Sequence, residues 1–185
     1  MNRLARAFFA RDTRIVAKDL LGKIIVSDDG ATPPRTARIV ETEAYHGVTD
    51  AASHAHRGPT PRSSIMFGEP GRAYVYIIYG VWYCLNIVTG EVGFPSAVLV
   101  RAGAVTGDDA RAGAGPGKLC RALGIDRKQN GEDLVAGSRL WLGDDGFGKV
   151  RASRGPRINI DYAGRWADKP WRFWITDHPS VSRKK

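Results

Sequence analysis

The sequence contains little cysteine and no evident signal-peptide core. Its 185 residues include two cysteines, Cys84 and Cys120, too few for a disulfide framework or for a zinc site built from cysteine ligands. Near the N-terminus, Arg3, Arg6 and Arg11 interrupt the short apolar stretch that a signal peptide would need as its hydrophobic core. These absences predict a protein of the reducing cytoplasm, in which both cysteines are small buried residues.

Acidic residues are also scarce relative to basic ones. Nineteen Asp and Glu stand against 28 Lys and Arg, which gives a formal net charge of +9. This excess is compatible with an anionic partner, either nucleic acid or an acidic membrane surface. The hydrophobic fraction of 43% and the charged fraction of 25% are ordinary for a globular protein and exclude disorder and collagen-like repetition. The length then predicts one domain over residues 1–185.

Long hydrophobic runs are absent except for the uncharged segment from Ala73 to Gly90. Its length is at the lower limit of what spans a bilayer as a helix. Its tyrosines and β-branched residues instead favour strands, and Gly80 falls where a turn would divide it into two strand lengths. We therefore predict a β-hairpin in this segment and no membrane partner.

Strand patterns outnumber helix patterns and do not alternate with them, which predicts an α+β fold. We expect a single compact domain with a mixed, largely antiparallel sheet and short helices. One helix is expected from Asp12, as N-cap, to Gly22, and another over Pro116–Leu123 with Gly124 at its end. Besides the hairpin, strands are expected over residues 23–27, 38–45, 97–101, 139–142, 150–152, 157–160 and 172–175. Residues 182–185 are expected to form a frayed basic tail.

A long segment rich in Gly, Pro, Ser and His runs from His46 to Pro70. Connections of this length are usually functional or mobile. It holds His54 and His56, with Asp50 upstream, and this spacing can ligate zinc or iron. No recognisable motif supplies a third ligand, so a chance spacing is the alternative, and we expect no metal.

The residues from Glu41 to Tyr45 read Glu-Thr-Glu-Ala-Tyr. In a strand, this spacing places Glu41, Glu43 and Tyr45 on one face. A glutamate at the end of a strand, beside a long loop, can activate water as a general base. From the pattern alone, a solvent-exposed strand face is the more frequent arrangement, and it stays open as the alternative.

Aromatic side chains are concentrated in the expected hairpin. Five of them lie within ten positions: Tyr74, Tyr76, Tyr79, Trp82 and Tyr83. Nucleobases are the flat partners that a basic protein meets, and Tyr79 would project outward from the turn. Basic residues also predominate over residues 53–90 and 146–166, which is the footprint of phosphate contacts. A tyrosine-rich core sheet and a solvated basic face are the alternatives.

Three ordered motifs give the chain a close resemblance to a known family. They are VETEAY at 40–45, YVYIIYG at 74–80 and GPGKLC at 115–120. Together with Arg101 after a short apolar strand and the segment 164–173, they resemble the alkyladenine (3-methyladenine) DNA glycosylases of the mammalian type, in their bacterial members. The resemblance covers nearly the whole chain and implies one α+β domain whose protruding β-hairpin inserts into DNA.

The resemblance implies a catalytic pair and a base pocket. Glu43 would be the general base that activates a water for attack at the sugar C1′, and Arg101 would hold that water. The pocket would consist of two tyrosines that sandwich the extruded base and two residues that complete the wall: Tyr45, Tyr76, His54 and Asn86.

The resemblance also implies DNA contacts. Tyr79 would be the wedge that fills the gap left in the duplex, and Arg62 and Lys118 would contact the DNA backbone. Chemistry on a base requires its removal from the stack, and an intercalating side chain offsets part of that cost. The implied partner is double-stranded DNA with a damaged purine, bound by a monomer in the cytoplasm, at the nucleoid.

The implied activity is hydrolysis of the N-glycosidic bond of alkylated or deaminated purines, of the 3-methyladenine, 7-methylguanine and hypoxanthine type, as the start of base excision repair. No cofactor is needed. No lysine accompanies the pocket motifs as an obvious amine nucleophile, so no lyase step is expected. A non-catalytic module that binds duplex DNA or structured RNA is the alternative. A nucleoside hydrolase acting on small molecules is a third possibility.

Overall fold

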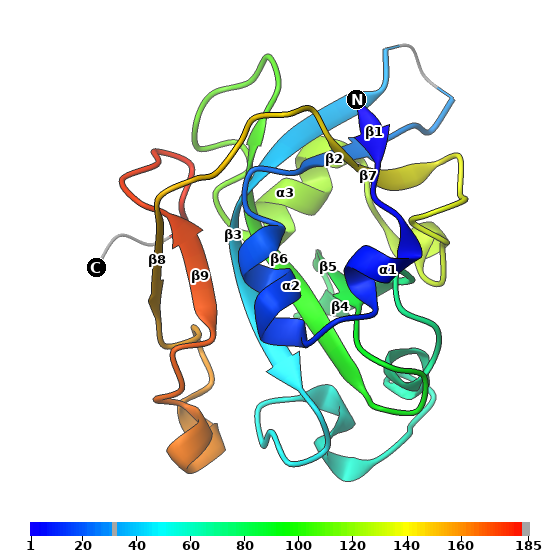
Figure 1. Ribbon diagram of the computed structural model, residues 1–185, viewed down its shortest axis with the longest axis vertical. Coiled ribbons are helices and arrows are strands. Elements are labelled where there is room, and N and C mark those ends of the chain that lie inside the picture. The colour runs from blue at the N-terminus through cyan, green and yellow to red at the C-terminus, as the bar shows by residue number, and fades with distance from the viewer. Residues whose placement is uncertain (31–32, 183–185) are drawn as a thin grey trace.

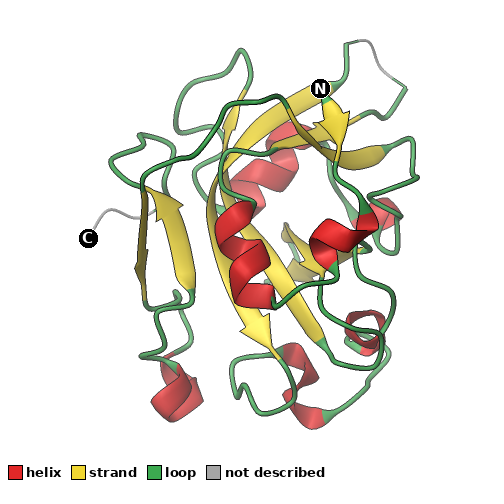
Figure 2. Ribbon diagram, in the orientation of Figure 1, coloured by secondary structure: helices red, strands yellow, loops and turns green. Residues whose placement is uncertain are grey.

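The computed structural model describes residues 1–30 and 33–182. The strands in this part of the chain are β1 (Asn2–Arg3), β2 (Ile24–Ser27), β3 (Arg35–His46), β4 (Ala73–Ile78), β5 (Trp82–Val88), β6 (Ser96–Val105), β7 (Leu140–Asp144), β8 (Ala152–Gly155) and β9 (Arg172–Ile175) (Figures 1 and 2). They form one sheet in the order β1, β7, β2, β3, β6, β5, β4, with β9 paired to β3 and β8 paired to β9. The pairings between these strands are antiparallel, which confirms the predicted α+β class.

The helices of the described residues are short. They are α1 (Arg6–Phe9), α2 (Thr13–Asp19) and α3 (Pro116–Leu123), and the 3-10 helices η1 (His54–Arg57), η2 (Ser64–Phe67), η3 (Arg127–Gln129) and η4 (Asp161–Trp166). Asp12 caps α2, because its carboxylate accepts a hydrogen bond from the backbone N–H of Arg14. Gly124 ends α3 in the left-handed conformation, with φ of 65°. Both predicted helices are confirmed, whereas the sequence pattern predicts no helix at α1.

Strand β3 is central to the sheet. It pairs with β2 through residues 35–38, with β6 along most of its length, and with β9 through residues 41–43. Its register against β6 shifts around Glu41, so a bulge interrupts the ladder near Arg101. A bulge adds local twist and re-aims side chains. The bulge therefore lies where the predicted catalytic residues of β3 and β6 come together.

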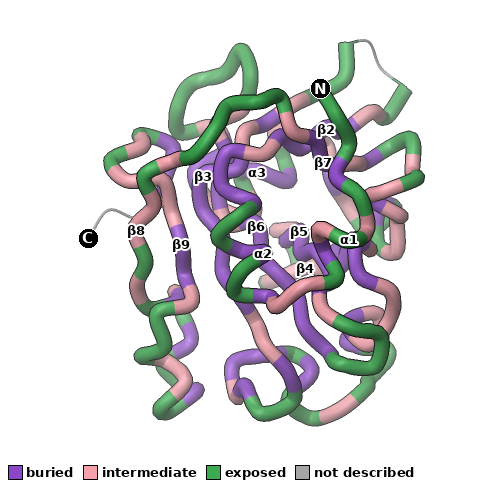
Figure 3. The backbone as a smooth tube through the Cα atoms, in the orientation of Figure 1, coloured by how far each residue is buried: buried purple, intermediate pink, exposed green. Residues whose placement is uncertain are grey.

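The main apolar core is formed by the sheet together with α2 and α3. Figure 3 shows β3 and β6 buried over most of their length. The Thr42 hydroxyl donates to the Ala17 carbonyl (2.7 Å) and ties β3 to α2. Helix α3 packs closely on β5, since a Cβ at Gly117 would lie 2.6 Å from the Trp82 ring. Glycine permits this approach, which brings the start of α3 next to the hairpin.

Strands β4 and β5 form the predicted β-hairpin, with residues 73–78 paired to 82–87. Tyr79 (φ 50°) and Gly80 (φ 70°) are the central residues of the turn, which the Val81 N–H closes by donating to the Ile78 carbonyl. Two consecutive positive φ angles are typical of a type I′ turn. The uncharged segment is thus a strand pair. Among the described residues, no helix is long and apolar enough to cross a membrane.

The strand prediction over residues 157–160 is wrong, and the one over residues 150–152 is correct only in part. Residues 157–160 form no strand, because Arg157 turns inward to a buried ion pair and Asn159 has the left-handed φ of 61°. The strand expected over residues 150–152 forms later, as β8. Of the expected tail, residues 183–185 lie outside the described residues. Ser182 is held in place, since its N–H donates to Glu41 Oε2 at 2.7 Å.

An ion pair between Asp50 and Arg157 anchors the segment before η4. Both side chains are 0% exposed, and two hydrogen bonds of 2.6 and 2.9 Å join them. Removing one partner leaves an unpaired buried charge, so Asp50→Asn should lower the free energy of unfolding by about 3 kcal/mol. Urea denaturation measures this. Asp145→Asn breaks the surface pair with Arg38 and should change stability little; equal losses in the two variants would contradict this account.

Candidate active site

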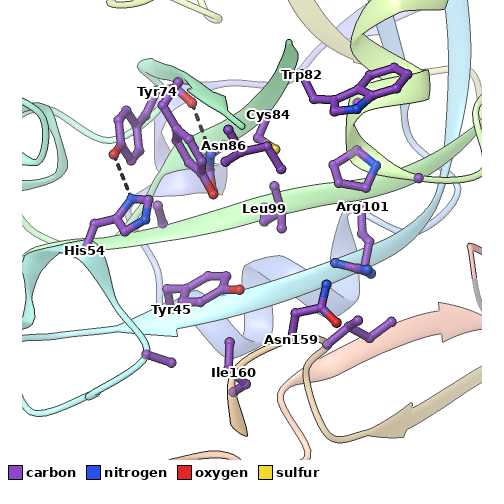
Figure 4. A pocket seen from close by; sticks show the side chains of 18 of the residues that line it. Tyr45, His54, Tyr74, Trp82, Cys84, Asn86, Leu99, Arg101, Asn159 and Ile160 are labelled. Carbon is purple, nitrogen blue, oxygen red and sulfur yellow. Dashed lines mark hydrogen bonds between the residues drawn. The ribbon is translucent and has the colours of Figure 1, made fainter. Parts of the chain in front are cut away.

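A cavity of about 490 Å³ opens between the β4–β5 hairpin, the start of α3 and residues 158–162 (Figure 4). Side chains of β3, β4, β5 and β6 also line it, so it lies where the centre of the sheet meets these surface segments. Most of the predicted site residues are on its wall: Tyr45, His54, Tyr76, Tyr79, Asn86, Arg101 and Lys118. A cavity this large accommodates a ring system of purine size.

One wall of the cavity is aromatic. Tyr74 and Tyr76 are two residues apart on β4 and face the same side, with ring centroids 5.1 Å apart. The His54 ring stands edge-on to Tyr76 at 4.7 Å, and its Nδ1 lies 2.8 Å from the Tyr74 hydroxyl (Figure 4). Burial, assisted by the charge of Arg62, lowers the pKa of His54 to about 4. The imidazole is therefore neutral at pH 7, and the wall presents flat, uncharged rings.

Tyr45 lies on the other side of the cavity, on β3 (Figure 4). Its hydroxyl donates to Glu43 Oε2 at 2.9 Å, and burial raises the pKa of this hydroxyl well above its usual value. Asn86 of β5 is 4% exposed, and its Nδ2 donates to the Tyr74 carbonyl at 3.2 Å. This hydrogen bond fixes the Asn86 amide within the wall.

Glu43 is fully buried directly beneath the cavity wall. Its Oε1 accepts a hydrogen bond from the backbone N–H of Ile158 at 2.8 Å, and its Oε2 accepts the one from Tyr45. Arg101 Nη1 lies 3.5 Å from Oε1. Burial raises the pKa of the Glu43 carboxyl, and the Arg101 charge opposes this effect. The carboxyl is thus a stronger base than an exposed glutamate.

Glu41, the other acid of the motif, has a different environment. It is 0% exposed, and its Oε1 accepts a hydrogen bond of 2.6 Å from Arg172 Nε on β9. Arg101 Nε lies 3.4 Å from the same oxygen. Arg101 therefore stands between the two carboxylates, with Glu41 on one side and Glu43 on the other. The alternative of a solvent-exposed strand face is wrong for both acids.

Tyr79 is at the tip of the hairpin and on the rim of the cavity. Its side chain is 87% exposed, and Val81 beside it is 66% exposed. The outward projection expected from the sequence is confirmed. A tyrosine with positive φ is strained, since a β-carbon disfavours the left-handed region. Backbone strain of this kind is concentrated at functional sites in proteins.

The two predicted backbone-contact residues occupy different positions. Lys118, in the first turn of α3, is exposed and lines the cavity. The sequence motifs predicted no lysine as an obvious amine nucleophile at the pocket, whereas the structure places Lys118 on the cavity wall. The guanidinium of Arg62 lies over the Tyr76 ring, 4.6 Å from its centroid, so the exposed Arg62 packs against the aromatic wall without lining the cavity.

Several residues at the cavity have no counterpart among the sequence predictions. Asn159 and Tyr162 line it, and Ile158 contributes the N–H that binds Glu43. The strand prediction over residues 157–160 concealed this segment. The two histidines with metal-like spacing separate: His54 contacts Tyr74, and His56 Nδ1 lies 2.7 Å from the Val48 carbonyl oxygen. Within the described ranges, no three His, Cys, Asp or Glu side chains are placed to hold a metal ion.

Comparison with known proteins identifies the family. The model of the family described as "Methylpurine-DNA glycosylase (MPG)" matches residues 7–179. The chain belongs to the methylpurine-DNA glycosylase family. A relative from Anaeromyxobacter dehalogenans (strain 2CP-1 / ATCC BAA-258) is 56% identical over 98% of this chain and 86% of its own length. Relatives from Methanocella arvoryzae and Legionella pneumophila are 46% and 44% identical and are covered over 96% and 100% of their lengths. Each is named "Putative 3-methyladenine DNA glycosylase".

The strained turn makes a prediction about stability. Asparagine adopts positive φ more readily than tyrosine, so Tyr79→Asn should raise the free energy of unfolding by about 1 kcal/mol. Urea denaturation measures the change. Val81→Asn is the control, since Val81 is also exposed and has no positive φ; it should give no such gain. A loss of stability in Tyr79→Asn would show that the ring packs in the fold.

Proposed function

We propose that this protein is a DNA glycosylase that flips alkylated or deaminated purines out of duplex DNA and hydrolyses their N-glycosidic bond. The substrates would be of the 3-methyladenine, 7-methylguanine and hypoxanthine type. Membership of the methylpurine-DNA glycosylase family supports the reaction class. The observation that carries the proposal is the buried Glu43, which lies behind Tyr45 and Arg101 in the wall of an aromatic cavity of purine size.

The cavity supports recognition of a damaged purine. In the proposal, the extruded base stacks between Tyr45 and Tyr76, while His54 and Asn86 fix its edge. Alkylation at N3 or N7 gives the purine a positive charge, and the faces of neutral tyrosine rings attract cations. Because the rings remain neutral at physiological pH, discrimination would arise from cation–π attraction and fit rather than from an ion pair.

The chemical step needs one water and one base. The water oxygen forms a bond with the sugar C1′ while the bond from C1′ to the purine nitrogen breaks, and the base leaves with the bonding electrons. Glu43 takes the proton from the water, and its negative charge stabilises the cationic character of the sugar. Arg101 holds the water beside Glu43. No side chain becomes covalently attached to the sugar, so no lyase step follows.

The surface around the cavity supports binding of duplex DNA by a monomer. Tyr79, at the tip of the hairpin, would enter the stack and fill the gap left by the flipped nucleotide. Lys118 is exposed at the cavity and would contact a backbone phosphate. Arg62, which lies over Tyr76, would contact the backbone beside the flipped base. Such a protein would work in the cytoplasm, on the DNA of the nucleoid.

The role of Glu43 can be tested by separating binding from excision. Glu43→Gln removes the general base but keeps the shape of the side chain, so the rate of hypoxanthine excision from a duplex should fall by about 10²–10⁴-fold. Single-turnover release of free base, without added metal, measures excision, and fluorescence anisotropy measures binding, which should be retained.

Glu91→Gln is the matched control, because Glu91 is exposed and does not line this cavity. It should excise like the unaltered protein. Undiminished excision by Glu43→Gln would exclude Glu43 as the base. Tight binding without any release by the unaltered protein would instead indicate a DNA-binding module.

A further inference from the structure

Two tyrosines at this cavity are largely exposed. Tyr79 is 87% exposed on the hairpin, and Tyr162 is 74% exposed on η4. Both line the rim of the same cavity, whereas the other tyrosines of the chain are buried or half-buried. A single exposed aromatic ring is ordinary on a protein surface, but two at the mouth of one cavity mark a contact surface. Tyr79 has a proposed role, and Tyr162 has none so far.

The segment that carries Tyr162 is held firmly in place. Arg157 forms the buried ion pair with Asp50 and donates hydrogen bonds to the carbonyls of Ala44 (2.9 Å) and Trp166 (3.2 Å). Ile160 is 4% exposed and packs with other buried residues on the same side. The exposed position of Tyr162 therefore results from a fixed backbone and not from a loose loop.

Asn159 adds an independent observation within the same segment. It has φ of 61°, a left-handed conformation that asparagine adopts more readily than most residues, and it lines the cavity. Figure 4 shows its side chain directed into the cavity from residues 158–160, on the opposite side of β6 from the hairpin residues Tyr74 and Trp82. Its exposed amide carries both a donor and an acceptor at the cavity wall, where a polar ligand can bind it.

We propose that residues 158–162, here called the second lip, are a DNA-contacting element that acts opposite the hairpin. Tyr162 packs against the lesion strand beside the flipped nucleotide, and the Asn159 amide hydrogen-bonds the flipped nucleotide itself. The inference rests on the proposed function for its partner, duplex DNA.

The charge around the second lip fits this partner. Of the five Lys and Arg in residues 146–166, Arg157 is buried against Asp50 and the other four are exposed, while exposed Lys118 lines the same cavity. At the inner end of the lip, the Ile158 N–H binds Glu43. A nucleotide bound by the second lip is therefore held by the same short segment that binds Glu43, the proposed general base.

Binding of a short duplex with one hypoxanthine tests the contact of Tyr162 with the lesion strand, here called the outer contact. Tyr162→Ala should weaken binding about tenfold, which is the loss expected for one aromatic contact with a nucleobase. Because Tyr162 is exposed, its replacement leaves stability unchanged in urea denaturation. Val92→Ala is the control, since Val92 is 71% exposed and does not line the cavity; it should bind like the unaltered protein. Binding of Tyr162→Ala within twofold of the unaltered protein would overturn the outer contact.

Asn159→Gly tests the inner contact, which is the hydrogen bond from the Asn159 amide to the flipped nucleotide. Glycine adopts φ of 61° without strain, so only the amide is lost. It should weaken binding of the hypoxanthine duplex several-fold and leave binding of an undamaged duplex unchanged. Equal binding of the lesion by Asn159→Gly and the unaltered protein would overturn this contact.

Release of hypoxanthine from the bound duplex separates the two proposals. If the unaltered protein binds the lesion but releases no base, the proposed function fails, and the binding losses still decide the role of the lip. If the unaltered protein binds no duplex DNA at all, both proposals fail.

Discussion

A carboxylate that is shielded from water is stable only where protein groups replace its hydration. Glu43 receives two such hydrogen bonds, from Tyr45 and from the backbone N–H of Ile158, and the Arg101 guanidinium lies beside it. These groups come from β3, from β6 and from the segment before η4, which are distant in sequence. Much of the architecture around the cavity, from the bulge between β3 and β6 to the buried Asp50–Arg157 pair, serves to bring them together.

The same constraint explains why Glu41 accompanies Glu43. Arg101 stands between two buried carboxylates, and Arg172 adds a second cation at the same Glu41 oxygen, Oε1. With two acids and two guanidinium groups the cluster is neutral, although it is almost wholly removed from water. Arg101 is thereby held on its inner side, while the rest of its side chain lines the cavity. The network places the Arg101 guanidinium beside Glu43, which is the arrangement that the proposed role of Glu43 as general base requires.

Local sequence patterns predicted the parts of the fold that depend on local chemistry. The hairpin follows from β-branched residues and tyrosines around Gly80, and α3 follows from Pro116 at its start and Gly124 at its end. Residues 157–160 were predicted wrongly, because their conformation depends on Asp50 and Glu43, over 100 residues earlier. The role proposed for Glu43 comes from the resemblance of its motif to a family, whereas the pattern of the motif alone favoured an exposed strand face. Burial of the carboxylate is a tertiary property that no local pattern encodes.

The dependence of excision on pH tests the central claim most directly. A substrate with 7-methylguanine carries a fixed positive charge on the purine. Protonation of the leaving group therefore contributes little to the pH dependence of the rate at low pH. Because burial raises the pKa of Glu43 above its ordinary value of 4.5, the single-turnover rate should fall on the acid side, with a midpoint above 4.5. The residual rate of Glu43→Gln should lack this decrease. A rate that stays constant down to pH 4.5, or the same decrease in Glu43→Gln, would contradict the account.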